Sequence, residues 1–225
     1  MIVVDGACGL DEPSVMLYLV GAPGSGKSTV MSALIDQLGL ATNGDAWFSI
    51  WPASLEGRKM HNEFRGEPLE DIVTGEVRGL YLGRNRKEFP GTDAIGMASH
   101  SEAVAWMENA PELPPLILGE GARIGTGKFL TACARRVDLV VGHLVAPREE
   151  LDERLAERWS QPTDKVYVND GKITPRVKSL QFLKASETKA FNAAVAAREA
   201  GALVIELDTF ELSPIDCVRL LIEAL

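Results

Sequence analysis

A run of residues from Gly21 to Ser28 has the types and spacing needed to hold a nucleotide phosphate. The segment GAPGSGKS places Gly21, Gly26, Lys27 and Ser28 in the pattern G-x-x-x-x-G-K-[ST] of the Walker A loop. Its glycines let successive backbone N–H groups turn toward one anion, and a helix that starts here directs its positive end at the same place. The spacing predicts a nucleotide site in which Lys27 reaches the β- and γ-phosphates and Ser28 binds Mg²⁺.

The residues around this loop provide the context that the motif requires. An apolar run of strand length, 15–20, comes before it, and residues 26–38 have the apolar spacing of a helix that packs on one face. The remaining loop residues are therefore further candidates for phosphate contacts: Gly24, Ser25 and Thr29.

The order of apolar segments predicts an α/β protein. Strands alternate with helices along the 225 residues, which indicates a three-layer α/β/α fold with a mainly parallel sheet of five or slightly more strands. We expect one domain over residues 1–225, with an acceptor-binding insert around 45–93 and a lid around 154–178. Strands are expected at 15–20, 45–50, 76–82, 114–120, 137–145 and 202–207; helices at 26–38, 94–107, 126–136, 147–159, about 176–200 and from 213; and a surface helix or loop at 56–70.

Composition and charge narrow the functional classes. The net charge of −9 argues against broad nonspecific binding to nucleic acid, although a local basic groove is compatible with it. No export signal or apolar run of membrane-spanning length is present, so a cytoplasmic protein without a membrane partner is expected, as a monomer or homodimer. The three cysteines are isolated, which predicts neither disulfides nor a zinc site.

Two acidic residues are candidates for catalysis. Glu120 ends the apolar segment PPLILGE, where an open α/β sheet places its ligand crevice, and it could hold Mg²⁺ or orient a nucleophile. A strand-end acid that caps a neighbouring helix is the alternative. Asp93, in FPGTDA, is the candidate base or acceptor-orienting group, and a helix N-cap is the competing interpretation.

Basic and aromatic residues supply acceptor-binding candidates. Arg84 and Arg86 suit an anionic acceptor because a guanidinium group matches phosphate geometry, but they could also be surface charges without a ligand. Trp47 and Trp51 could stack on a base, although packing in the core is the commoner fate of aromatic residues.

A second basic group has the character of a lid. Arg154 and Arg158 lie four residues apart on a predicted helix, and Arg176 follows a polar loop. Phosphoryl transfer needs cations at the developing charge, which a closing segment commonly supplies. The alternative is that these arginines pair with glutamates of the same helix, which contributes little to stability.

Taken together, the Walker A loop, the strand that ends in Glu120, the segment APREELDERLAER and the C-terminal IELDTFELSPIDCVRLLIEAL resemble the small P-loop kinases, such as nucleoside monophosphate, shikimate and gluconate kinases. This resemblance implies a P-loop NTPase fold, ATP and Mg²⁺ as cofactors, and base contacts from Thr209 and Phe210. The segment LGRNRKEFPGTDAIGM, with LILGEGAR and TPRVKSL, resembles phage-associated kinases that phosphorylate 5-hydroxymethyluracil in DNA or deoxynucleotides, which adds Arg123 as an acceptor-binding candidate.

These observations lead to one hypothesis and two alternatives. The hypothesis is an ATP-dependent kinase that transfers the γ-phosphoryl group to a nucleotide-type acceptor, either a hydroxymethylpyrimidine in DNA or a deoxynucleoside monophosphate. A kinase for a sugar or antibiotic hydroxyl is the first alternative, and an ATPase switch without an acceptor is the second.

Overall fold

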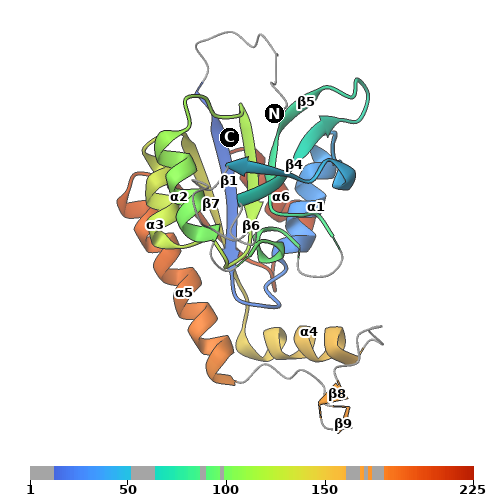
Figure 1. Ribbon diagram of the computed structural model, residues 1–225. Helices are drawn as coiled ribbons and strands as arrows, with labels where there is room; N and C mark the ends of the chain where they lie inside the picture. Colours follow the sequence, from blue (N-terminus) through green and yellow to red (C-terminus); the bar gives the residue numbers. More distant parts are fainter. Residues whose placement is uncertain are drawn as a thin grey trace.

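A parallel sheet forms the centre of the protein in this computed structural model. The structure describes residues 13–51, 64–86, 90–96, 99–160, 168–169, 172–173 and 180–225. Five strands run parallel in the order β10, β7, β1, β6, β5 (Figure 1). Their inner members are buried on both faces, which explains their continuous apolar sequences. The bounds are Val15–Gly21 (β1), Val77–Leu82 (β5), Leu116–Glu120 (β6), Asp138–Val145 (β7) and Leu203–Asp208 (β10). The predicted mainly parallel α/β sheet is confirmed.

Three antiparallel strands extend the sheet beyond β5. β4 (Phe64–Asp71) pairs with β5, and both β2 (Leu40–Thr42) and β3 (Phe48–Trp51) pair with β4. The prediction of a surface helix or loop for 56–70 is therefore wrong over 64–70, while 52–63 lie outside the described residues. The strand predicted at 45–50 begins only at Phe48, because Gly44–Ala46 form a short 3₁₀ helix.

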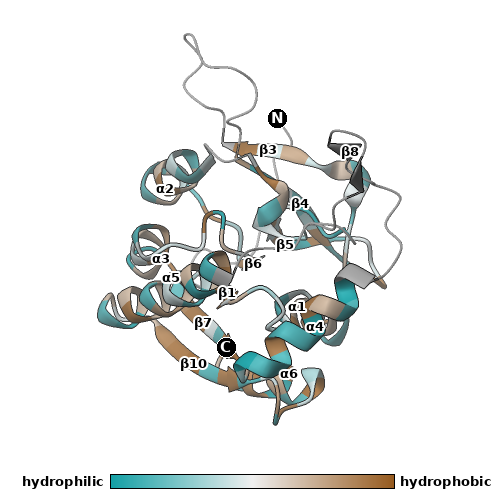
Figure 2. Cartoon of the chain, turned by 90° about the horizontal axis from the view of Figure 1, so that it is seen from below, coloured by the Kyte–Doolittle hydropathy of each residue, from teal (hydrophilic) through white to brown (hydrophobic). Residues whose placement is uncertain are grey.

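Two layers of helices enclose the sheet, as Figures 1 and 2 show from two directions. One face is covered by α2 (Ser99–Asn109), α3 (Gly127–Ala134) and α5 (Leu180–Glu199), and the other by α1 (Lys27–Gln37) and α6 (Pro214–Ile222). Alternate residues of β1 point into the two resulting cores: Tyr18 packs with Phe129 of α3, and Leu17 lies in the cluster that contains Leu34 of α1. The sheet edge with the carboxyl ends of the parallel strands remains available for a site.

The helix boundaries follow local capping. Thr126 and Ser213 accept hydrogen bonds from the first turns of α3 and α6, as expected of N-cap residues. The predicted helix 94–107 is wrong at its beginning, because Thr92–Ala94 form a separate 3₁₀ turn and α2 starts at Ser99. Gly96, between the two, is a poor helix residue.

The segment after β7 leaves the sheet at its carboxyl end. α4 (Arg148–Ser160) lies beyond this edge and away from the two helix layers (Figure 1). Of the chain between α4 and α5, the structure describes only the short pair β8 (Val168–Asn169) and β9 (Lys172–Ile173). No helix in the described part of the chain has the length and apolar character needed to span a bilayer.

Candidate active site

The loop between β1 and α1 depends on its glycines. Gly24 and Gly26 have φ values of 87° and 83°, in the left-handed region that residues with side chains rarely adopt. At Gly21 space is limiting, because a Cβ atom there would lie 2.5 Å from the Ser25 Oγ atom. Gly26 is the N-cap residue of α1, so the unpaired amide groups at the start of this helix face the loop. This arrangement is suited to bind a phosphate.

Lys27 lies across the loop. Its Nζ atom donates hydrogen bonds to the carbonyl oxygens of Gly21 at 3.0 Å and Ala22 at 2.8 Å, and to Ser25 Oγ at 3.4 Å. Ser25 is fully buried, whereas Thr29, in the first turn of α1, is exposed. The oxygens of a bound phosphate could replace the loop carbonyls as partners of the ammonium group, since both are hydrogen-bond acceptors.

Ser28 and Glu120 come together from adjacent elements. The Ser28 hydroxyl donates to Glu120 Oε2 at 3.1 Å, and the Tyr81 hydroxyl donates to Glu120 Oε1 at 3.2 Å. The parallel register of β1 with β6, and of β6 with β5, brings these residues to one edge. Sequence analysis paired Ser28 with Glu120 as metal ligands but missed Tyr81, which looks like any other aromatic residue of a buried strand.

Glu120 is a buried carboxylate with a perturbed pKa. Only 2% of the residue is exposed, and this burial raises its pKa above the usual value. The charge of Lys27 and the hydrogen bonds from Ser28 and Tyr81 oppose the shift, whereas the negative charge of Asp93 adds to it. Glu120 therefore lies close enough to Lys27 and Asp93 to interact with both.

The oxygen atoms of Ser28 and Glu120 fit the chemistry of Mg²⁺. This ion is usually held by one or two carboxylates together with substrate phosphates and waters, rather than by a cage of protein ligands. The described residues contain no cluster of three His, Cys, Asp or Glu side chains that could hold a metal by themselves. The hydrogen bond of 3.1 Å between the two side chains brings a hydroxyl and a carboxylate together beside the loop.

Asp93 lies in a turn against the end of β6. The residue is the second of the 3₁₀ turn Thr92–Ala94, whose N-cap is Gly91, so Asp93 caps neither this turn nor α2. A Cβ atom added at Gly121 would lie 3.4 Å from Asp93 Cγ, which places the carboxylate over the residue after Glu120. Arg123 donates to the Asp93 carbonyl oxygen at 3.4 Å, so this acceptor-binding candidate lies at the same turn.

Arg84 is held in place at the carboxyl end of β5. Its Nε atom lies 3.5 Å from Oε1 of Glu67, and an NH2 donor reaches the Gly44 carbonyl oxygen at 3.4 Å. The guanidinium groups of Arg84 and Arg65 lie 5.7 and 6.0 Å from the centre of the Trp47 ring. The Trp47 ring thus contacts cations in this structure, and Glu67, a fully buried carboxylate, is a residue that sequence analysis missed.

The structure gives less information on the other acceptor-binding candidates. Arg86 is exposed just beyond Arg84, and its charge acts on Glu67. For Trp51 the backbone ends β3, but the side chain lies outside the described residues, as does Arg176 of the predicted lid.

Arg154 and Thr209, which sequence analysis assigned to different tasks, contact each other. Arg154 donates to Thr209 Oγ1 at 3.0 Å, to the Thr209 carbonyl oxygen at 2.8 Å and to Glu150 Oε1 at 2.6 Å. The ion pair with Glu150 is the one that sequence analysis gave as the alternative. Arg154 therefore joins α4 to the loop after β10, next to Gly26. Arg158, one turn further along α4, and Phe210, after Thr209, are exposed.

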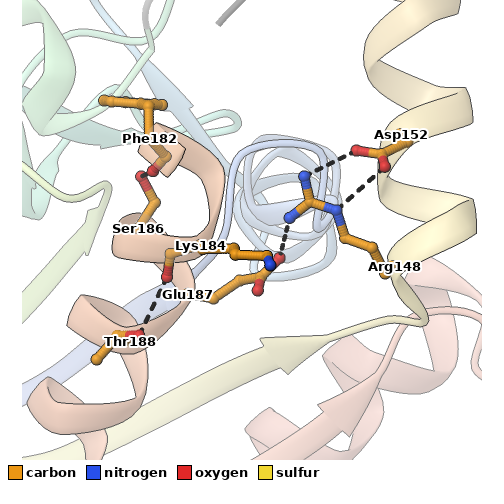
Figure 3. A network of polar contacts seen from close by, with 7 residues as sticks. All are labelled: Arg148, Asp152, Phe182, Lys184, Ser186, Glu187 and Thr188. Carbon is orange, nitrogen blue, oxygen red and sulfur yellow. Dashed lines mark hydrogen bonds and ion pairs between the residues drawn. The ribbon is translucent and has the colours of Figure 1, made fainter. Parts of the chain in front are cut away.

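Arg148 was not singled out from the sequence, yet it connects α4 with α5. Its guanidinium group pairs with Asp152 at 3.0 Å and with Glu187 of α5 at 2.6 Å (Figure 3). These hydrogen bonds raise the pKa of Arg148. Glu187 also lines a cleft of about 330 Å³ that extends to Ala22 of the phosphate loop and Leu151 of α4. The network therefore fixes the start of α4 beside the loop.

The comparison with known protein families covers the residues of this site. The model of a family described as P-loop Nucleotide Kinase3 matches residues 13–161, which include the loop, Asp93, Glu120 and α4. No curated protein matches the chain. The unliganded crystal structure of a sugar kinase from Janibacter sp. HTCC2649 is similar at 18% identity and a TM-score of 0.45, over 94% of each chain. Because the family model matches most of the chain, the protein belongs to the P-loop Nucleotide Kinase3 family and is a phosphotransferase with a P-loop NTPase fold.

Proposed function

We propose that the protein transfers the γ-phosphoryl group of ATP to a nucleotide-type acceptor. The observation that carries this proposal is the meeting, at one edge of the sheet, of the phosphate loop with Lys27, the Ser28–Glu120 pair and the Asp93 turn. A donor phosphate on the loop and an acceptor beside Asp93 would then both lie close to Glu120. Direct transfer requires two bound substrates that lie close together.

Each residue has a distinct task in this proposal. Lys27 and the loop amides bind the β- and γ-phosphates, and Ser28 with Glu120 hold Mg²⁺, which neutralises phosphate charge when it is bound. Asp93 orients the acceptor group and, where that group is a hydroxyl, accepts its proton. The pair of Arg154 and Thr209 lies on the donor side, next to Gly26, where it would contact the ATP base or ribose together with Phe210. Arg158 is the remaining lid candidate for the transferring group.

The position of Arg84 favours an acceptor substrate that carries an anionic group. An ion pair with Glu67 and a hydrogen bond from NH2 to the Gly44 carbonyl oxygen hold the Arg84 guanidinium group in position. The Arg84 side chain is 40% exposed, so a substrate can reach it. A guanidinium group held in this way suits a phosphate, and both a nucleoside monophosphate and a nucleotide within DNA supply one. Arg86, Arg123 and Arg176 are further candidates for the same group.

The two acceptor classes can be separated by one screen. Purified protein with γ-labelled ATP and Mg²⁺ would be offered free deoxynucleoside monophosphates in one set, and single-stranded or duplex DNA that contains hydroxymethylpyrimidines in the other. Label in a diphosphate identifies a nucleotide kinase, and label in DNA identifies a base-modifying kinase that must extract its base from the stack. Label only in sugars or aminoglycosides added as a third set would contradict a nucleotide-type acceptor.

Arg84→Ala is expected to raise the KM for the acceptor about 10- to 100-fold, because a charged hydrogen bond to a phosphate is lost. The value of kcat should change much less, since the proposal assigns Arg84 to binding of the acceptor and not to the transferring group. The matched control is Arg78→Ala, near the opposite end of β5, where the exposed Arg78 side chain pairs with Asp71 and Glu76. If the Arg84 and Arg78 variants had equal KM values for the acceptor, Arg84 would not be a residue that binds the acceptor.

A further inference from the structure

A set of buried hydrogen bonds connects the phosphate-loop strand with the turn that carries Asp93. The Tyr18 hydroxyl of β1 lies 2.9 Å from the Gly121 carbonyl oxygen and 3.1 Å from Thr92 Oγ1, and it shares its one hydrogen between these two acceptors. The Thr92 hydroxyl in turn donates to the Glu120 carbonyl oxygen at 2.8 Å. Tyr18 and Thr92 are both fully buried, so water cannot replace these bonds without a rearrangement.

The surrounding chain leaves space for the Tyr18 ring. A Cβ atom added at Gly119 would lie 2.7 Å from Tyr18 Cε2, and one added at Gly125 would lie 2.7 Å from Tyr18 Cε1. The LILGE strand therefore needs a glycine before Glu120, because a side chain at position 119 would collide with the Tyr18 ring. A phenylalanine at position 18 would fill the same space, so the ring accounts for the packing and the hydroxyl for the connection to the turn.

The turn itself lies directly against Glu120. Gly91 has a φ of 64°, and a Cβ atom there would lie 2.5 Å from Glu120 Cγ and 2.7 Å from the Glu120 carbonyl oxygen. Thr92, the next residue, bonds to that same carbonyl, and Asp93 follows immediately. The position of Asp93 relative to Glu120 is therefore determined by the contacts of the two residues before it.

We propose that Tyr18 and Thr92 are positioning residues, which hold Asp93 where it can orient the acceptor. This inference rests on the proposed function, because it assigns Asp93 to the acceptor. The two hydroxyl groups contact neither substrate, and they act only by fixing the turn between the Glu120 carbonyl oxygen and the acceptor. Loss of either hydroxyl should therefore reduce kcat while the KM for ATP stays close to the wild-type value.

The test compares Thr92→Val with Thr92→Ser, which differ in the hydroxyl, and adds Tyr18→Phe, which keeps the ring. With the acceptor found by the screen, we expect Thr92→Val and Tyr18→Phe to lower kcat about 10-fold or more, because displacement of a catalytic group by about 1 Å can cost up to 100-fold. Thr92→Ser should retain most of the wild-type kcat. Wild-type kcat in both Thr92→Val and Tyr18→Phe would overturn the inference, and Tyr18→Phe serves if the valine variant does not fold.

A double-variant cycle distinguishes this inference from the proposed function. In the background of Asp93→Asn, single-turnover transfer should not fall further when Tyr18→Phe is added, because the hydroxyl acts through Asp93. A full multiplicative loss in the double variant would overturn the positioning role while Asp93 keeps its own. Wild-type turnover in Asp93→Asn alone, or no labelled acceptor with the wild-type protein, would contradict the proposed function itself and with it the inference.

Discussion

Lys27→Ala is expected to lower kcat/KM for phosphoryl transfer about 30- to 900-fold, equivalent to roughly 2 to 4 kcal/mol of lost transition-state stabilisation. The reason is the position of the ammonium group, which lies over the loop with bonds of 2.8 and 3.0 Å to the carbonyl oxygens of Ala22 and Gly21. Without this cation, the negative charge that develops on the transferring group loses the partner that the proposal assigns to it. Steady-state kinetics with ATP as the varied substrate measures the effect.

Lys128→Ala is the matched control for this prediction. Lys128 follows Gly127 at the start of α3 in the segment GTGK, which resembles the GSGK of the phosphate loop but belongs to another helix. Its removal should leave kcat/KM within about 2-fold of the wild type, as for most surface substitutions. Unchanged turnover in Lys27→Ala, with the thermal unfolding of both variants like that of the wild type, would contradict the assignment of the loop.

Glu120→Gln is expected to lower kcat about 100-fold or more and, at the same time, to stabilise the folded protein near neutral pH. The loss of activity follows from the loss of the negative charge that, with Ser28, would hold Mg²⁺. The gain in stability follows from burial, because the folded state of the wild type must ionise a carboxyl group that is almost fully removed from water. An amide fills the same space and can still accept a hydrogen bond from Ser28 or Tyr81.

The pH dependence of this stability difference has a definite sign. Burial raises the pKa of Glu120 in the folded state above its usual value near 4.5, so the folded protein binds its proton more tightly than the unfolded chain. The contribution of Glu120 to stability is therefore complete below pH 4.5 and is lost as the pH rises through the folded-state pKa. In the absence of nucleotide, the unfolding midpoint of Glu120→Gln should exceed that of the wild type by an amount that grows from pH 4 to pH 8. A difference that stays constant over this range would contradict a raised pKa.

The parallel core of the fold could be predicted from the sequence because its signals are local. The strands at β1, β6 and β7 are continuous apolar runs, and the first residues of α3 and α6 follow clear N-cap residues. β4 gave no such signal: FRGEPLED contains a proline, a glycine and four charged residues. Its interior position depends on pairing with β5 and on the burial of Glu67, which are tertiary contacts.

The same distinction applies to the candidate site. The phosphate loop and Glu120 could be found because a motif and a strand end identify them. The roles proposed for Tyr18 and Thr92 could not be found in this way, because the two residues lie 74 positions apart and their hydroxyl groups come together only in the folded protein. The contact of Arg154 with Thr209, which lie 55 residues apart, also depends on how α4 follows β7 at the sheet edge.

The proposed kinase activity is tested most directly by measuring where the γ-phosphate goes. Protein, Mg²⁺ and γ-labelled ATP would be incubated with and without the nucleotide-type acceptors, and label would be quantified both in the acceptor and as inorganic phosphate. We expect that an acceptor accelerates ATP consumption and receives nearly all of the label, and that Lys27→Ala reduces both. Release of the label as inorganic phosphate, at a rate that no acceptor changes, would identify an ATPase and contradict the proposed phosphoryl transfer to an acceptor.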